Sequence, residues 1–145
     1  MGESSKTLYT LSCMNYWLIK TEPEEYSFDD LLKDKKAVWD GIRNYQARNN
    51  LKKMKRGEKI LVYHTGKFKE IVGIAKVIKE YYADPSDKTN SWVVVELEAE
   101  KKLNKPFKLE QIKKEKLLCD IPLLKQGRLS VMPITNKEFN FVVSW

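Results

Sequence analysis

Apolar and polar residues alternate through residues 92–101, and this alternation is the clearest structural signal in the chain. One parity carries Val93, Val95, Leu97 and Ala99, whereas the other carries Val94, Glu96, Glu98 and Glu100. A period of two places the two sets on opposite faces of extended backbone. We therefore predict a half-exposed β-strand over residues 92–101.

Other apolar runs predict further strands. Residues 16–21, 59–65 and 70–80 are rich in valine, isoleucine and leucine, and proline or glycine lies beside each of them. Such runs are typical of short strands. Residues 106–109 are a further short candidate, and residues 126–135 are predicted as a loop or a short strand.

Helical periodicity appears after the Asp40-Gly41 turn, where Ala47, Leu51 and Met54 form an apolar stripe at i, i+4 and i+7. Ser27 is placed to cap a short helix whose first turn is acidic. Residues 109–118 are predicted as a helix or turn, and we expect Asn136 to cap a final helix that runs through Val143.

Short helices between strands, without regular βα alternation, favour an α+β fold. A sheet of this kind can curl into a small barrel with helices at its ends. We find no repeat or linker and expect a single domain over residues 14–145. Residues 1–13 are expected to be a disordered tail, and Met14 is an equally natural start. No apolar run approaches the roughly 20 residues that a membrane helix needs.

The net charge of +7 is concentrated in one segment. Residues 33–59 hold ten Lys and Arg residues against three Asp and Glu residues, so this segment accounts for the whole excess. A focused positive surface attracts polyphosphates such as nucleic acids. A lysine-rich, solvated helix is the alternative interpretation.

The same basic segment contains Trp39-Asp-Gly-Ile-Arg-Asn-Tyr-Gln-Ala-Arg48, which we select as the candidate site. Asn44 and Arg48 are four residues apart and share one helix face at a helix N-terminus, where backbone N–H groups favour anions. Trp39 precedes the turn and is suited to stacking on a base.

Residue types typical of enzymes are sparse. The chain has no glycine-rich phosphate loop, no nucleophile elbow and no metal-ligand spacing. His64 is the only imidazole, and we expect it to form a structural hydrogen bond or to contact a ligand edge. Cys13 and Cys119 are far apart in sequence, so we expect a reducing compartment. Two cysteines and one histidine are too few ligands for a Cys/His metal site, and we expect neither a metal nor a cofactor.

Several stretches together resemble the EVE domain, a member of the wider PUA-like superfamily. The matching stretches, in order, are residues 16–23, 39–49, 63–65, 72–75, 83–85 and 128–133. The 39–49 stretch is the most specific of them. The family more often has serine at the position of Thr65. Threonine keeps the hydroxyl group, so this departure changes little.

This resemblance implies a PUA-like curled mixed β-barrel of about five or six strands with peripheral short helices. It also implies a pocket that accepts one flipped, modified nucleobase, such as a 5-modified cytosine in DNA or a modified base in RNA. The related YTH domain holds a methylated adenine in an aromatic cage. EVE-like modules also occur beside nucleic-acid modification and restriction machinery, and we expect a cytoplasmic protein, associated with the nucleoid or, in a eukaryote, nuclear.

We therefore expect a non-catalytic nucleic-acid reader in which aromatic side chains hold the base. Trp39 is the first candidate for stacking, while core packing is the default for Trp17 and Trp92 on their predicted strands. The candidate ligand-binding residues are Trp17, Lys20, Trp39, Gly41, Arg43, Asn44, Tyr45, Arg48, Tyr63, His64, Trp92, Arg128 and Ser130. The candidate phosphate-binding residues are Arg43, Arg48, Lys52 and Lys53.

Two alternatives stay open. Some PUA-like relatives hydrolyse modified nucleosides with lysine, threonine and glutamate side chains, and Lys20, Thr21 and Glu22 supply the same residue types. Strand alternation predicts that Lys20 and Glu22 converge while Thr21 points away. The other alternative is a scaffold that binds proteins through its basic face.

Overall fold

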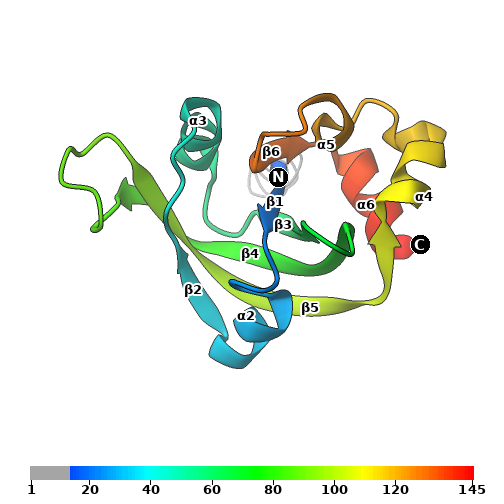
Figure 1. Cartoon of the computed structure of the whole chain (residues 1–145), viewed down its shortest axis with the longest axis horizontal. Helices are drawn as coiled ribbons and strands as arrows, with labels where there is room; N and C mark the ends of the chain where they lie inside the picture. Colours follow the sequence, from blue (N-terminus) through cyan, green and yellow to red (C-terminus); the bar gives the residue numbers. More distant parts are fainter. Residues whose placement is uncertain (1–13) are drawn as a thin grey trace, which may run out of the picture.

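A computed structural model describes residues 14–145 of the chain, so the tail expected at residues 1–13 lies outside the described part. Six strands form one mixed sheet in the order β2-β5-β4-β3-β1-β6 (Figure 1). Their bounds are β1 Tyr16–Thr21, β2 Lys36–Trp39, β3 Lys59–His64, β4 Glu70–Ala83, β5 Val93–Lys108 and β6 Val131–Ile134. β1 and β3 are parallel, and the other neighbours are antiparallel.

The predicted α+β class and curled mixed sheet are confirmed, with a sheet that curls without closing. The two edge strands, β2 and β6, are not hydrogen-bonded to each other. The long strands β4 and β5 sweep across the molecule and pair along most of their length (Figure 1). Register shifts within this pair bend the sheet, as β-bulges do.

The alternation predicted for residues 92–101 holds from Glu96 onward. Val94 is fully buried like its neighbours Val93 and Val95, because both faces of β5 are covered at its start. The strand also continues to Lys108 and absorbs the shorter strand predicted at residues 106–109.

Helices lie at both ends of the sheet, with α3 toward one end and α4, α5 and α6 toward the other (Figure 1). The helical elements are α2 Phe28–Asp34, α3 Tyr45–Lys53, α4 Leu109–Lys114, the 3-10 turn η1 Lys116–Leu118, α5 Pro122–Lys125 and α6 Asn136–Ser144. Ser27 caps α2 as predicted. Thr135 caps α6 instead of Asn136, because Thr135 and Glu138 form a reciprocal capping box.

Packing in the core accounts for the apolar stripe of α3 and for the glycine at position 73. Ala47, Leu51 and Met54 are fully buried, as their spacing predicts. A Cβ at Gly73 would lie 2.3 Å from the ring of Phe28, so the close approach of α2 to β4 requires glycine here.

Candidate functional site

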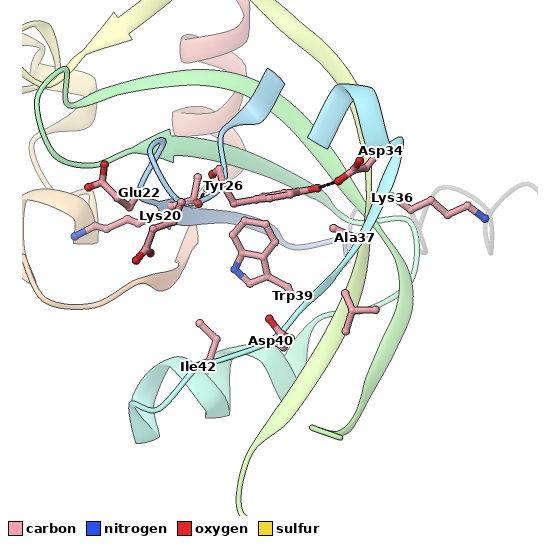
Figure 2. Close-up of a pocket in the computed structure, with 12 residues that line it drawn as sticks. Lys20, Glu22, Tyr26, Asp34, Lys36, Ala37, Trp39, Asp40 and Ile42 are labelled. Atoms are coloured by element: carbon pink, nitrogen blue, oxygen red, sulfur yellow. Dashed lines mark hydrogen bonds between the residues drawn. The ribbon is translucent and has the colours of Figure 1, made fainter. Parts of the chain in front are cut away.

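A cavity of about 510 Å³ opens between the end of β1, the turn before α2, and β2 (Figure 2). This volume lies within the range of roughly 300–1,000 Å³ that small-molecule sites occupy. Its lining comprises Lys20, Thr21, Glu22, Glu25, Tyr26, Asp34, Lys36, Ala37, Val38, Trp39, Asp40 and Ile42. The first part of the selected 39–48 run therefore contributes directly to this cavity.

Two aromatic rings form a corner of the cavity. The centroids of Tyr26 and Trp39 are 6.1 Å apart and their planes meet at 71° (Figure 2). The Tyr26 hydroxyl donates a hydrogen bond of 2.8 Å to Asp34 Oδ2, which fixes its ring. Burial and this carboxylate raise the pKa of Tyr26, so the phenol stays neutral. A flat heterocycle stacked on one ring would meet the other nearly at right angles.

Trp39 is predicted from the sequence as a site residue, whereas Tyr26 is not. Tyr26 follows two glutamates and precedes the helix cap Ser27, and this local pattern predicts only a helix start. Its role as a cavity wall depends on β2, which returns to lie opposite the turn that holds it.

The end of β1 supplies polar groups to the cavity. Lys20 Nζ donates to Gly127 O at 2.7 Å, and burial lowers the pKa of this amine. Thr21 Oγ1 donates to Tyr26 O at 2.6 Å. Lys20, Thr21 and Glu22 all contribute to the cavity lining. The expected divergence of the Thr21 side chain from the other two stays a prediction.

Carboxylates outnumber cations around the cavity. Its lining holds Glu22, Glu25, Asp34 and Asp40 against Lys20 and Lys36. Carboxylates accept hydrogen bonds and repel phosphates. The cavity is therefore suited to a ligand that presents N–H or O–H donors, and it disfavours phosphate groups.

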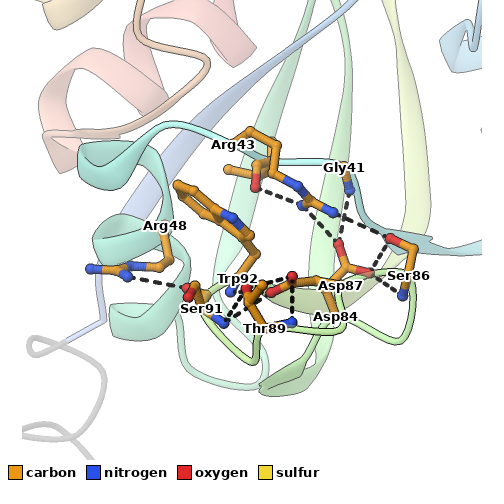
Figure 3. Close-up of polar contacts among 10 residues, drawn as sticks. Gly41, Arg43, Arg48, Asp84, Ser86, Asp87, Thr89, Ser91 and Trp92 are labelled. Atoms are coloured by element: carbon orange, nitrogen blue, oxygen red, sulfur yellow. Dashed lines mark hydrogen bonds and ion pairs between the residues drawn. The ribbon is translucent and has the colours of Figure 1, made fainter.

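Arg43, by contrast, lies in a network of protein contacts (Figure 3). Its Nη1 lies 3.0 Å from Oδ2 of Asp84, a carboxylate with a fully buried side chain. Asp84 also accepts hydrogen bonds from Gly41 N and from the backbone and hydroxyl of Ser86. Burial alone would raise the pKa of Asp84, but the hydrogen bonds from Ser86, Arg43 and Gly41 outweigh it and hold the pKa at about 2.

Trp92 joins both arginines into one group, which we call the Arg43–Trp92 cluster: Arg43, Tyr45, Arg48, Asp84 and Trp92. Each guanidinium carbon lies 5.7 Å from the Trp92 ring centroid, and the Tyr45 ring lies 5.0 Å from it. Arg48 also donates to Ser91 O at 3.1 Å (Figure 3). None of these five residues lines the cavity.

The remaining predicted residues of the basic helix face solvent or complete the helix. Asn44 caps α3, where its Oδ1 accepts from Ala47 N at 2.9 Å. Lys52 and Lys53 are exposed, and Lys52 Nζ lies 5.7 Å from the exposed ring of Tyr81. Phosphate binding by these lysines stays a prediction.

Three other predicted ligand-binding residues form contacts within the protein or are buried. Trp17 is buried and donates through Nε1 to Glu58 Oε1 at 2.9 Å. His64 Nε2 accepts from Phe28 N at 3.0 Å, and burial is the main cause that lowers its pKa. Tyr63 is buried, which raises the pKa of its phenol.

On β6 and the loop before it, Ser130 O accepts from Lys20 N at 2.9 Å and Arg128 is exposed. Of the predicted ligand-binding residues, Lys20 and Trp39 thus meet at the cavity, while Gly41 contributes its N–H to Asp84. Within residues 14–145, no helix is long and apolar enough to cross a membrane.

The family model of the EVE domain matches residues 15–145. The chain belongs to the EVE domain family. The resemblance carried by the sequence motifs is therefore confirmed over nearly the whole chain. Among curated relatives, thymocyte nuclear protein 1 of Danio rerio is 35% identical over 162 residues, which cover 88% of this chain and 70% of that protein.

Solved structures place this EVE domain among close neighbours. The NMR structure of a protein from Rhodopseudomonas palustris has a TM-score of 0.86 and 39% identity, covering 90% of this chain and 92% of that one. The crystal structure of human THYN1 protein in complex with 5-methylcytosine-containing DNA has a TM-score of 0.83 and 33% identity, covering 90% and 96%. An ASCH protein of Zymomonas mobilis, at 13% identity and a TM-score of 0.55, shares the fold alone.

Proposed function

We propose that this EVE domain is a non-catalytic reader of a modified base in nucleic acid, with a 5-modified cytosine in DNA as the first candidate. The observation that carries this proposal is the cavity with its Tyr26–Trp39 corner and carboxylate-rich rim. A relative that is 33% identical over 90% of this chain was solved with DNA containing 5-methylcytosine, which supports the same choice of ligand.

The cavity chemistry favours a base with an amino group. Cytosine presents an N4 amino donor, which a carboxylate accepts, whereas thymine presents the O4 acceptor at the same position. A base that stacks on Trp39 brings its edge toward these carboxylates. Taking the base out of a duplex costs a few kcal/mol, so single-stranded or mismatched sites should bind more tightly than matched duplex.

Apolar side chains at the cavity, Ala37 and Ile42, are suited to contact a 5-methyl group. Burial of one methyl group contributes about 1 kcal/mol, which corresponds to roughly a fivefold preference. We therefore propose modest selectivity between modified and unmodified cytosine rather than an absolute filter.

Phosphate contacts are assigned to the outer face of α3 and its flank. Arg48, Lys52 and Lys53 lie there, while the charge of Arg43 is balanced by Asp84. Neutralisation of phosphates by these side chains makes binding fall with rising salt.

Titration of a matched oligonucleotide set tests the proposal. The set holds one central cytosine, 5-methylcytosine, 5-hydroxymethylcytosine or thymine, in single-stranded DNA and RNA, and affinity is measured by fluorescence anisotropy at two salt concentrations. We expect the modified cytosines to bind most tightly and thymine most weakly, and Trp39→Ala to abolish the ranking. Equal affinity for all bases, or a ranking unchanged in Trp39→Ala, would contradict the proposal.

Hydrolysis of a modified nucleoside is the second candidate function, because Lys20, Thr21 and Glu22 line the same cavity. The hydroxyl of Thr21 donates to Tyr26 O rather than to a basic side chain, and an activated nucleophile needs a base within hydrogen-bond reach. This contact favours the reader. Incubation with acylated or alkylated cytidines, followed by chromatography, separates the two: turnover that disappears in Lys20→Ala would establish the enzyme instead.

The names of the relatives also bear on the cellular location of the protein and on its partners. Curated relatives carry the name thymocyte nuclear protein 1, so we propose that this EVE domain acts on nuclear or nucleoid DNA together with nucleic-acid modification or restriction machinery. Crosslinking and sequencing of the bound DNA or RNA tests this setting. Recovery of sites without modified bases would contradict it.

A further inference from the structure

A second basic surface lies at the turn between β3 and β4, remote in sequence from α3. Phe68 projects from this turn with 65% of its surface exposed. Four exposed lysines surround it: Lys67, Lys69, Lys108 and Lys113. None of the four forms an ion pair with another residue in the described part of the chain. We call these five residues the Phe68 surface.

The Phe68 surface is held in place by backbone contacts. Leu109 N donates to Lys69 O at 2.9 Å, and Glu70 pairs with Lys108 in the β4–β5 ladder. The residues border a hollow of about 650 Å³, in which Glu70 and Glu110 are the acidic members. Positive charge therefore dominates this hollow, whereas negative charge dominates the cavity beside Tyr26 and Trp39.

A third hollow lies between the two sites and shares lining residues with both. A smaller hollow of about 250 Å³ is lined by Lys20, Thr65, Gly66, Lys69 and Leu109, among others. Lys20 also lines the base cavity, and Lys69 and Leu109 also line the hollow of the Phe68 surface. Neighbouring hollows therefore share residues from Lys20 at the end of β1 to Lys69 beside Phe68.

The turn also contacts the cavity rim directly. Thr65 Oγ1 donates to Glu22 Oε2 at 3.3 Å, and Glu22 is a cavity residue. Gly66 has a φ of +82°, and a Cβ there would lie 2.8 Å from Glu22 Oε2. The positive φ of Gly66 favours glycine in the turn that carries Phe68, and this turn contacts the cavity rim.

We propose that the Phe68 surface binds a single-stranded segment of the nucleic acid that flanks the base held in the cavity. The lysines neutralise phosphates of that segment, and the Phe68 ring stacks on one of its unpaired bases. This inference rests on the proposed function, because it takes the cavity as the anchoring point of the strand.

Charge and shape together favour a nucleic-acid strand over an acidic peptide. Four lysines around one exposed aromatic ring match the alternation of phosphate and flat base along a strand. An acidic peptide would use the lysines but would gain little from stacking on the ring.

The test compares a short ligand, a long ligand in two forms, and three variants of the whole protein. One ligand is a trinucleotide with a central 5-methylcytosine, which occupies the cavity, and the other is a 12-nucleotide single strand extended on its 5′ or its 3′ side. The variants are Phe68→Ala, the pair Lys67→Glu with Lys113→Glu, and Lys137→Glu, an exposed charge reversal on α6 as the matched control. Affinities are measured at two salt concentrations.

We expect Phe68→Ala to weaken the 12-nucleotide strand by about 5- to 100-fold, for one extension direction only. The lysine pair should reduce the salt slope by about 0.7 for each phosphate that the protein no longer neutralises. Trinucleotide affinity should stay unchanged in both, and Lys137→Glu should bind both ligands like the unaltered protein.

Two results would overturn the inference: an unchanged affinity of Phe68→Ala for the long strand, or an equal loss for both ligands. Polyglutamate of equal charge serves as a competitor. If it displaces the long strand as well as a competing oligonucleotide does, and still does so from Phe68→Ala, the surface would belong to an acidic protein instead. Failure of the proposed function gives a different pattern, in which the trinucleotide shows no preference for 5-methylcytosine while Phe68→Ala still weakens the long strand.

Discussion

Trp39 and Arg43 are four residues apart in one motif, yet they belong to regions of opposite character. Trp39 lines a solvent-open cavity whose carboxylates Glu25 and Asp40 form no side-chain hydrogen bond with a described residue. Arg43 lies in the Arg43–Trp92 cluster, where buried Asp84 is saturated with donors. The comparison separates side chains that are available to a ligand from side chains that hold the fold.

The reason for this difference is burial. A buried carboxylate must be paired, because its desolvation is otherwise too costly, and Asp84 therefore binds Arg43, Ser86 and Gly41 at once. Exposed Asp40 has no such requirement. One motif thus lines a cavity with its first residues and stabilises the fold with Arg43.

The largest expected effect separates the two regions by stability. Asp84→Ala should lower the free energy of unfolding by about 3 kcal/mol, because it leaves Arg43 and the Gly41 N–H without their acceptor. Asp40→Ala, the matched change at the cavity rim, should alter it by less than about 0.5 kcal/mol. Urea denaturation followed by tryptophan fluorescence measures both, and equal losses would remove the distinction.

The second expected effect separates the two tryptophans by ligand preference. Trp39→Ala should remove the preference for 5-methylcytosine over thymine, because the stacking ring is lost; stacking on one base is worth about 1–3 kcal/mol. Trp92→Ala should keep that preference while it loosens Arg43 and Arg48. Anisotropy titration at one salt concentration is sufficient, and loss of preference in Trp92→Ala would move the binding site to the cluster.

A smaller effect on oligonucleotide affinity is expected at Arg48. This residue donates a hydrogen bond to Ser91 O and lies on the basic helix α3. Arg48→Ala should weaken all oligonucleotides alike, by a few-fold, and reduce the salt slope by about 0.7–0.9. Arg48→Lys, which keeps the charge, should retain the slope. A base-dependent loss would show instead that Arg48 contacts the base.

The smallest effect concerns pH and the support of the cavity wall. His64 Nε2 accepts from Phe28 N beside Tyr26, and burial lowers the pKa of His64 although Glu70, Asp29 and Glu22 act in the opposite direction. The unfolded chain then binds the proton more readily than the folded chain, so stability should fall as pH decreases below about 6.5. Thermal unfolding between pH 7.5 and 5.5 measures this fall, and His64→Gln should reduce it. A flat profile would mean that His64 does not titrate in this range.

Much of the fold could be predicted from local patterns. The period of two in residues 96–100 and the stripe of Ala47, Leu51 and Met54 reflect which side of an element meets the core. The helix starting after Ser27 follows from its reciprocal cap with Asp30. The cap of α6 was wrong by one residue because Thr135 and Asn136 are both good capping residues, and only Glu138 distinguishes them.

The candidate site was predicted in part. Trp39 and Lys20 were selected by their place in the sequence, and both line the cavity. Tyr26, Phe68 and the cavity carboxylates Glu25 and Asp34 were not selected, because nothing in the local sequence around them indicates a binding role. Their importance comes from β2, α4 and the β3–β4 turn, which lie beside them only in the folded chain.

The sequence by itself determined most of the strands and helices, the family and the excess of positive charge, because these depend on residue order and composition. It did not reveal β2, which is only four residues long. Tertiary structure alone decided where that charge acts. It paired Arg43 with Asp84, 41 residues away, and it left acidic groups around the cavity beside Trp39. Electrostatic contacts and burial depend on distances through space, which residue order does not specify.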